Sequence, residues 1–164
     1  FRDGSVGAFH VSGPVTFRDG IRPSALPSPS LTKELKGEEI KTIIFCPSNP
    51  LLSIDPILSI QGLKTGFIDS GAKIVAVTPI VNGAAIKGPA AKNLKEFGYP
   101  VSALTVANHY RGLIHGFVLD QRDHDEAKQI EKLGISVLQA DTIMNDVKTK
   151  VKLAEKTLEF AYSI

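Results

Sequence analysis

The chain has no tryptophan, one cysteine and one methionine among its 164 residues. A lone cysteine excludes an internal disulfide framework and is typical of the reducing cytoplasm, where we expect the protein to work. The four histidines and the cysteine show no zinc-type spacing. No apolar run approaches the ~20 residues that a membrane span requires, and no signal-peptide pattern opens the chain. These absences exclude secreted disulfide scaffolds, zinc-binding modules and membrane-spanning proteins as classes.

An excess of charge of one sign is also absent. Nineteen Lys and Arg residues face 17 Asp and Glu residues, giving an intermixed net charge of +2, which argues against nucleic acid as the main partner. An initiator methionine is lacking too, because the chain begins at Phe1 and its only methionine is Met144. We therefore expect the chain to be part of a longer polypeptide. Its 43% hydrophobic and 22% charged residues are ordinary for one globular domain of this length.

Residues 1–40 form a lead-in that is rich in glycine, proline and serine. Short strand signals at residues 8–12 and 14–18 lie among turn-forming residues, and a proline-rich connector follows. Ser30 is placed to cap a connector helix that runs to about Glu39. We therefore expect the main domain to begin near Lys41.

Residues 41–164 carry a cleaner pattern, in which short apolar runs alternate with helical segments. Such an alternation predicts a mostly parallel sheet with helices on both faces, a Rossmann-like three-layer α/β/α fold. In such folds a ligand binds beyond the carboxyl ends of the strands. The predicted strands are residues 42–46, 73–78, 116–120 and 136–140. The predicted helical segments are residues 55–70, with a glycine interruption, and residues 89–97, 102–110, 123–133 and 147–162. The loops at the ligand edge are residues 47–53, 79–88, 121–123 and 141–146.

The first of these loops contains the sequence Pro-Ser-Asn-Pro between a strand and a helix. Free N–H groups at a helix start, the positive end of its dipole and the side chains of Ser48 and Asn49 suit a phosphate group. The alternative is a turn in which these residues and Ser53 have structural roles.

The second loop has the stronger case for anion binding. Gly83 and Gly88 allow the backbone to approach a ligand, Lys87 supplies a compact positive charge, and a helix begins at Pro89. The alternative is a solvated lysine beside a flexible loop.

The later part of the chain offers weaker candidates. Asp141 and Asn145 follow a buried strand and are placed to contact a ligand, whereas we expect Asp146 to cap the last helix and Asp120 to cap a neighbouring loop. Cys46 has no adjacent base, which predicts a packed thiol rather than a nucleophile. The residues His109, Tyr110 and Arg111 form a polar cluster that suits a helix C-terminus. No GxGxxG follows any strand and no GxxxxGK[ST] occurs, so the common nucleotide fingerprints are absent.

Five segments in register resemble one family. Their order and spacing are similar to the C-terminal half of the CofD-like 2-phospho-L-lactate transferases of coenzyme F420 biosynthesis, and the resemblance covers roughly residues 11–164. It identifies residues 41–164 as a partial CofD-like domain. The segments are CPSNPLLSIDPIL (residues 46–58), AVTPIVNGAAIKGPAAK (76–92), VSALTVANHY (101–110), GFVLD (116–120) and LQADTIMND (138–146).

The resemblance implies a magnesium-dependent transferase. It would move a 2-phospholactyl or phosphoenolpyruvyl-type group from a guanosine-diphosphate-activated donor to the deazaflavin Fo and release GMP. Such chemistry requires charge stabilisation and in-line positioning more than a covalent nucleophile. Small-molecule partners and a homodimer are implied as well. The implied site residues are Ser48, Asn49 and Ser53 near the donor phosphate, Lys87 and Gly88 at the developing charge, Thr78 and Asn82 along the crevice, and Asp141, Thr142 and Met144 at the nucleotide or deazaflavin pocket.

The chain departs from the family pattern at its N-terminal side. The Gly-rich first strand and loop of the family, and the acidic residues expected to hold magnesium, have no match here, so we expect no metal ligand in this segment. We expect residues 1–164 alone to lack transferase activity. One alternative is a regulator that binds UDP-N-acetylglucosamine without transfer, as in the related gluconeogenesis-factor family, although there the first loop is more like GPGSLYTS. Another is a purely structural or oligomerisation domain.

Overall fold

The computed structural model describes residues 10–11, 15–16, 26–37 and 39–164. Within the lead-in, β1 (His10–Val11) pairs antiparallel with β2 (Val15–Thr16). These short strands fall inside the two strand signals of the sequence, whose flanking positions lie outside the described residues. Helix α1 (Pro29–Lys36) is the last element of the lead-in before the main domain.

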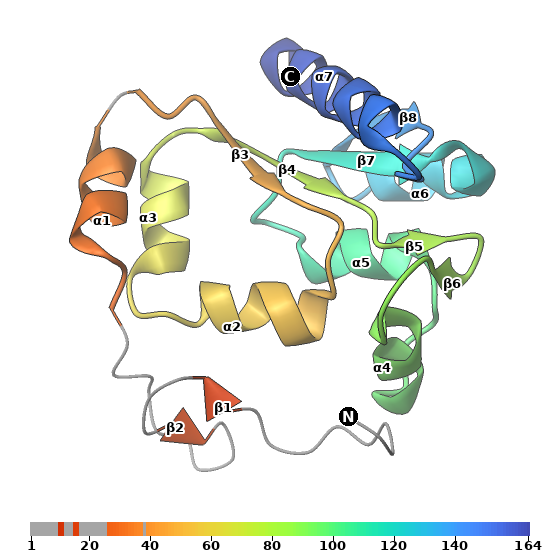
Figure 1. The fold of residues 1–164 in the computed structure, drawn as a ribbon, viewed down its shortest axis with the longest axis horizontal. Helices are drawn as coiled ribbons and strands as arrows, with labels where there is room; N and C mark the ends of the chain where they lie inside the picture. The colour runs from red at the N-terminus through yellow and green to blue at the C-terminus, as the bar shows by residue number, and fades with distance from the viewer. Residues whose placement is uncertain (1–9, 12–14, 17–25, 38) are drawn as a thin grey trace.

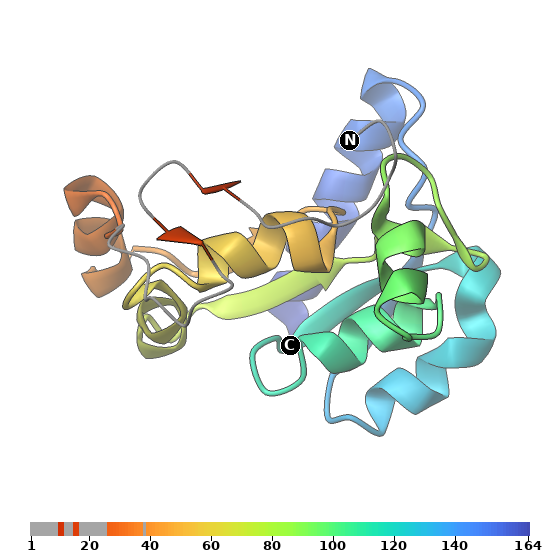
Figure 2. The ribbon, with the colours of Figure 1, turned by 90° about the horizontal axis from the view of Figure 1, so that it is seen from below.

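Four parallel strands form the central sheet, in the order β3-β4-β7-β8. All four carboxyl ends therefore meet at one edge, as the sequence predicted. Figures 1 and 2 both place α1 and α3 together at the end where β3 and β4 begin, and α4 with the β5–β6 hairpin at the other end. The strands are β3 (Thr42–Phe45), β4 (Lys73–Val77), β7 (Gly116–Asp120) and β8 (Ser136–Ala140).

Alternate side chains of the strands enter two cores. Ile74 and Phe117 pack into the larger core, beneath the helices that connect the strands, whereas Val75 and Val118 pack against α7 (Val147–Ser163). This alternation follows from the two-residue period of a strand. The result is the predicted three-layer α/β/α arrangement. The connecting helices are α2 (Asp55–Leu58), α3 (Leu63–Asp69), α4 (Ala90–Glu96), α5 (Ala103–His109) and α6 (Ala127–Glu131).

The close approach of α7 to the sheet depends on Gly116. A Cβ atom at this position would lie 2.7 Å from a ring carbon of Phe160 and 2.8 Å from Cδ1 of Ile164. A larger residue at this position would require the side chains of Phe160 and Ile164 to shift away from β7.

Several helix boundaries differ from the sequence prediction. The cap of α1 is Ser28, whose Oγ accepts from the N–H of Leu31, and not Ser30; the helix ends at Lys36 because Gly37 adopts an extended conformation. Residues 55–70 form two helices, α2 and α3, and Gly62 between them has a left-handed φ of 80°, so the predicted glycine interruption is confirmed. The π-helical η2 (Pro50–Ile54), which precedes α2, lies in the segment predicted as a loop.

Other boundaries are confirmed. Ser102 caps α5, and Asp146 caps α7 in a reciprocal capping box with Thr149. The helix predicted over residues 123–133 begins earlier, as the 3₁₀ segment η3 (Gln121–Glu126), and continues as α6. Among the residues that the structure describes, no helix has both the length and the apolar composition to cross a membrane.

Candidate functional site

Buried side chains join the four loops at the carboxyl edge of the sheet. Each of three carboxylate or amide groups bridges two segments that are far apart in the sequence. The bridges run from Asn49 to Asn93, from Asp123 to Asn82 and from Asp120 to Thr142. The four predicted loops therefore form one connected surface rather than four independent turns.

The first bridge joins the Pro-Ser-Asn-Pro loop to α4. The side-chain N–H of Asn49 donates to Oδ1 of Asn93 at 2.7 Å, and both residues are buried. Oδ1 of Asn49 accepts from the N–H groups of Leu51 and Leu52, at 3.0 and 3.1 Å, and so caps η2. Asn49, predicted to donate to a ligand phosphate, thus makes its hydrogen bonds within the protein. Ser48, next to it, is half-buried and stands at the loop surface.

The second bridge holds a hairpin that the sequence prediction missed. Strands β5 (Ile80–Val81) and β6 (Ala84–Ala85) pair antiparallel around Asn82 and Gly83, whose φ angles of 50° and 69° are left-handed. An Asn-Gly pair between short strands is a strong hairpin signal, and it could have been found. Both carboxylate oxygens of Asp123 accept from the N–H of Asn82, at 2.9 and 3.0 Å.

The base of this hairpin is set by Thr78. Its hydroxyl donates to the carbonyl of Ile80 at 2.7 Å and accepts from the N–H of the same residue at 3.1 Å. Because Thr78 is 2% exposed and bonds to the backbone of Ile80, its side chain sets the backbone at the base of the hairpin rather than presenting a free hydroxyl.

The third bridge is centred on Asp120, which is fully buried. It accepts from the backbone N–H and the hydroxyl of Thr142, at 2.9 and 2.7 Å, and from the N–H and guanidinium of Arg122, both at 2.9 Å. Burial alone would raise the pKa of Asp120, but these hydrogen bonds outweigh it and hold the pKa below its usual value. Arg122 also donates to Asp141 at 3.3 Å. The expectation that Asp120 caps a neighbouring loop is confirmed.

Glu126 extends the network to α5. Its Oε2 accepts from the N–H of Leu104 at 2.6 Å, in the first turn of that helix. Burial raises the pKa of Glu126, and the negative charge of Asp123 raises it further. The hydrogen bond from Leu104 acts in the opposite direction but does not cancel the rise. Two acidic residues of one turn therefore hold the hairpin and α5 together.

Several residues of the second loop face outward. Asn82, Lys87 and Gly88 are exposed, and Gly88 has a left-handed φ of 73° that favours glycine. Ser53 is half-buried within η2. Met144 packs, half-buried, against the core beneath α7. Asp141 lines a cavity of about 220 Å³ whose wall includes Lys152 and Lys156 of α7.

Two expectations change. Cys46 is exposed, so the prediction of a packed thiol is wrong. Phe45 is the last residue of β3 and is buried in the core, and Cys46 follows after the strand has ended.

The polar cluster predicted at the end of α5 is split between two environments. His109 pairs with Asp55 of α2 at 2.8 Å, whereas Tyr110 is buried with its ring centroid 5.6 Å from that of Phe45.

The described residues do not fit a magnesium site. Among them, no group of three or more His, Cys, Asp or Glu side chains lies together. The carboxylates of Asp120 and Asp141 both accept from the guanidinium of Arg122. Magnesium prefers several oxygen ligands that are free to coordinate it.

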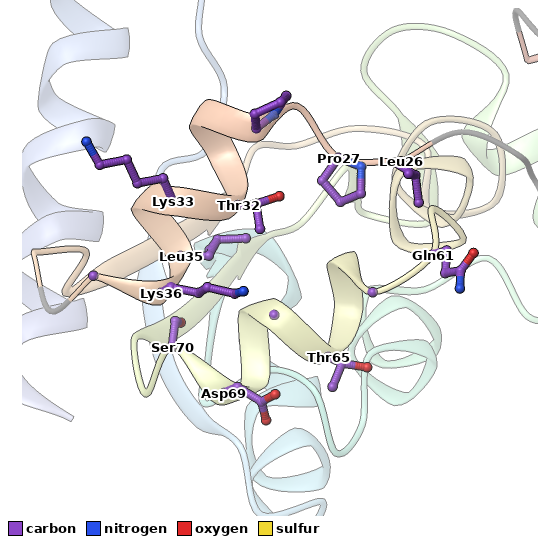
Figure 3. Close-up of a pocket in the computed structure, with 14 residues that line it drawn as sticks. Leu26, Pro27, Thr32, Lys33, Leu35, Lys36, Gln61, Thr65, Asp69 and Ser70 are labelled. Atoms are coloured by element: carbon purple, nitrogen blue, oxygen red, sulfur yellow. The ribbon is translucent and has the colours of Figure 1, made fainter.

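A much larger cavity, of about 1480 Å³, lies between α1 and α3 (Figure 3). Both helices lead directly into the amino ends of strands, α1 into β3 and α3 into β4, so the cavity is remote from the carboxyl edge. Leu35 and Lys36 of α1 point toward α3. None of the ligand-binding residues predicted from the sequence lines this cavity.

The fold and its edge define the protein class: a Rossmann-like α/β protein whose polar loops converge beyond the carboxyl ends of a parallel sheet. A family model described as 2-phospho-L-lactate transferase CofD matches residues 20–158. The chain belongs to this CofD family, which confirms the resemblance of its five segments.

Individual relatives agree with the family model. The chain is 38% identical over 136 residues to a 2-phospho-L-lactate transferase of Methanosarcina barkeri, covering 83% of this chain and 42% of that enzyme. It is 37% identical over 140 residues to the enzyme of the same name from Methanocaldococcus jannaschii, covering 85% and 43%. A phosphoenolpyruvate transferase of Streptomyces griseus is 32% identical over 141 residues, covering 85% and 44%. The chain thus spans less than half the length of these relatives.

Proposed function

We propose that the complete protein transfers a 2-phospholactyl or phosphoenolpyruvyl-type group from a guanosine-diphosphate-activated donor to the deazaflavin Fo, releasing GMP, in coenzyme F420 biosynthesis. Membership of the CofD family supports a transferase, and the names of the relatives supply the two candidate groups. The observation that carries the proposal is the Asn49–Asn93 bridge, since it brings the Ser48 loop and the helix that follows Lys87 to one edge of the sheet.

The proposed chemistry is displacement at phosphorus. The terminal ribityl hydroxyl of Fo forms a new P–O bond, the P–O bond to GMP breaks, and the hydroxyl proton leaves to solvent. Negative charge then moves onto the departing phosphate, where a nearby ammonium group and N–H donors lower the barrier. Lys87 and the amide of Gly88 suit this role because both are exposed in the same loop.

The other proposed contacts follow from position. Ser48 donates to the donor phosphate from its hydroxyl, and Asn82 borders the crevice from the tip of its hairpin. Asn49 and Ser53 lie near the phosphate, Thr78 lines the crevice, and Asp141, Thr142 and Met144 border the nucleotide or deazaflavin pocket. Because the described residues do not fit magnesium, no step is assigned to it. A cytoplasmic homodimer that acts on small molecules, and not on nucleic acid, belongs to the same proposal.

The test is transfer by the complete protein. Supplied with Fo, magnesium and the activated donor, it should form the phosphodiester product and GMP, both followed by mass spectrometry. Residues 1–164 alone should give no turnover under the same conditions. Binding of UDP-N-acetylglucosamine in preference to GDP, without transfer to Fo, would contradict the proposal and favour a nucleotide-sugar-binding regulator.

A further inference from the structure

Asn93 occupies a position on α4 where packing alone would favour an apolar side chain. It is 2% exposed, and its buried neighbours on the same helix are Ala90 and Leu94. A buried amide costs free energy unless it is hydrogen-bonded, and an isosteric leucine would bury more apolar surface. The polar side chain at this position therefore has a role other than core packing.

The hydrogen bond to Asn93 and the two backbone N–H groups of η2 together set the orientation of the Asn49 amide. Oδ1 of Asn93 accepts from Nδ2 of Asn49, and this leaves Oδ1 of Asn49 facing the N–H groups of Leu51 and Leu52. If the Asn49 amide were turned over, two oxygens would face each other at one end, and its NH₂ group would face two backbone N–H groups at the other. Asn93 therefore stabilises the orientation of Asn49 that caps η2.

The same bond couples two loops. Ser48 immediately precedes Asn49, and Lys87 lies before the first turn of the helix that carries Asn93. The two asparagines are 44 residues apart in the sequence, and α4 contacts η2 directly. The position of Ser48 relative to Lys87 thus depends on this contact.

We propose that Asn93 is a positioning residue that holds the Ser48 loop in register with the Lys87 loop, so that one phosphate-bearing ligand can contact both. The ligand class rests on the proposed function; the register of the loops does not. Asn93 touches no substrate in this role and acts through Asn49.

The kinetic test compares three variants of the complete protein. Asn93→Leu removes the accepting oxygen at similar volume, and we expect the KM for the nucleotide donor to rise at least tenfold while the KM for Fo changes less than twofold. Asn93→Asp keeps an accepting oxygen and should restore the donor KM to within threefold of the wild type. Lys92→Ala, on the exposed face of the same helix, should match the wild type. Equal losses in Asn93→Leu and Asn93→Asp, or an unchanged donor KM in Asn93→Leu, would overturn the proposal.

A second measurement does not depend on turnover. Hydrogen exchange of peptides covering residues 49–54 should be at least tenfold faster in Asn93→Leu, and the exposed thiol of Cys46 should react with a maleimide at a changed rate. Adding Asn93→Leu to Asn49→Ala should cause no further change in exchange, because the two residues act through one bond. If the wild type shows no transfer, the proposed function fails, while exchange still decides the role of Asn93. Unchanged exchange in a folded Asn93→Leu protein would refute the positioning role of Asn93. If Asn93→Leu does not fold, exchange in the Asn49→Ala and Asn93→Asp proteins tests this role instead. Exchange at the wild-type rate in Asn49→Ala would then refute it.

Discussion

The carboxyl edge of the sheet and the cavity between α1 and α3 are built in different ways. At the edge, buried carboxylates and amides join segments that are 22 to 44 residues apart in the sequence. Around the cavity, the side-chain hydrogen bonds of Ser28, Thr32 and Ser70 join residues at most four positions apart. The edge is therefore held by long-range polar contacts, and the cavity is a space left between two helix surfaces.

Under the proposed function, the larger of the two cavities is not the functional site. The cavity of about 1480 Å³ is far larger than the one of about 220 Å³ at the edge, yet the residues that the family motifs supply lie at the edge. A site that must hold a phosphate in one geometry needs donors fixed by other groups. The predictions below test whether the two regions differ in stability and in activity as their construction implies.

The largest effect is expected at Asp120. Replacement by alanine removes an anion that accepts four hydrogen bonds, and it leaves the buried N–H and hydroxyl of Thr142 without an acceptor. We expect Asp120→Ala to lower the free energy of unfolding by about 3–5 kcal/mol, as measured by urea denaturation. Thr65→Ala, at an exposed position of the cavity, should change it by less than about 0.5 kcal/mol. Similar losses in the two variants would remove the distinction between the regions.

The second prediction compares lysine-to-alanine substitutions in the two regions. Lys87→Ala should lower kcat/KM for transfer about a hundredfold, because a preorganised charge at the departing phosphate is lost. Lys36→Ala, beside the cavity, should leave kcat/KM unchanged. Both lysines are exposed, so the melting temperature of each variant should stay near that of the wild type. A larger loss in Lys36→Ala than in Lys87→Ala would move the functional site to the cavity.

The sequence predicted the sheet well, for a physical reason. Strands such as β4 and β7 are short apolar runs whose side chains are buried almost throughout, and burial on both faces leaves such runs little alternative. Short caps such as Ser102 and Asp146 were also predicted, because a cap and its N–H partner are neighbours in the chain.

The candidate site was predicted only in part. Its loops were found because strand ends are local, but the bridges that join them are long-range contacts that no spacing reveals. Asn93 and Asp123 were missed for this reason. Asn49 and Thr142 were expected to face a ligand, and the structure instead shows their side chains in internal hydrogen bonds.

The third prediction concerns the hairpin at the edge. Asp123→Ala removes the carboxylate that accepts from the N–H of Asn82, and we expect a loss of about 2 kcal/mol in the free energy of unfolding. Asp123→Asn keeps an accepting oxygen but not the charge, so its loss should be smaller. Hydrogen exchange at residues 80–85 should increase in the same order. If the hairpin exchanged as slowly in Asp123→Ala as in the wild type, the bridge would not be what holds it.

The smallest effect is expected at the amino end of the sheet, where the long-range hydrogen-bond acceptor is His115 and not a carboxylate. Its Nδ1 accepts from the N–H of Ile74 at 3.0 Å, which requires the neutral imidazole. Burial, together with the charge of Lys73, lowers the pKa of His115 from the usual 6.5. The folded state therefore binds the proton less readily than the unfolded chain, so this contribution to stability is complete above pH 6.5 and is lost as the pH falls through the lowered pKa. At the edge, Asp120 has a lowered carboxylate pKa, so its contribution is lost only in more acidic solution, below its usual pKa of 3.8. Urea denaturation between pH 7 and pH 5 should show a small decline that His115→Ala abolishes and Asp120→Asn retains. A decline that persists in His115→Ala would assign this pH dependence to another group.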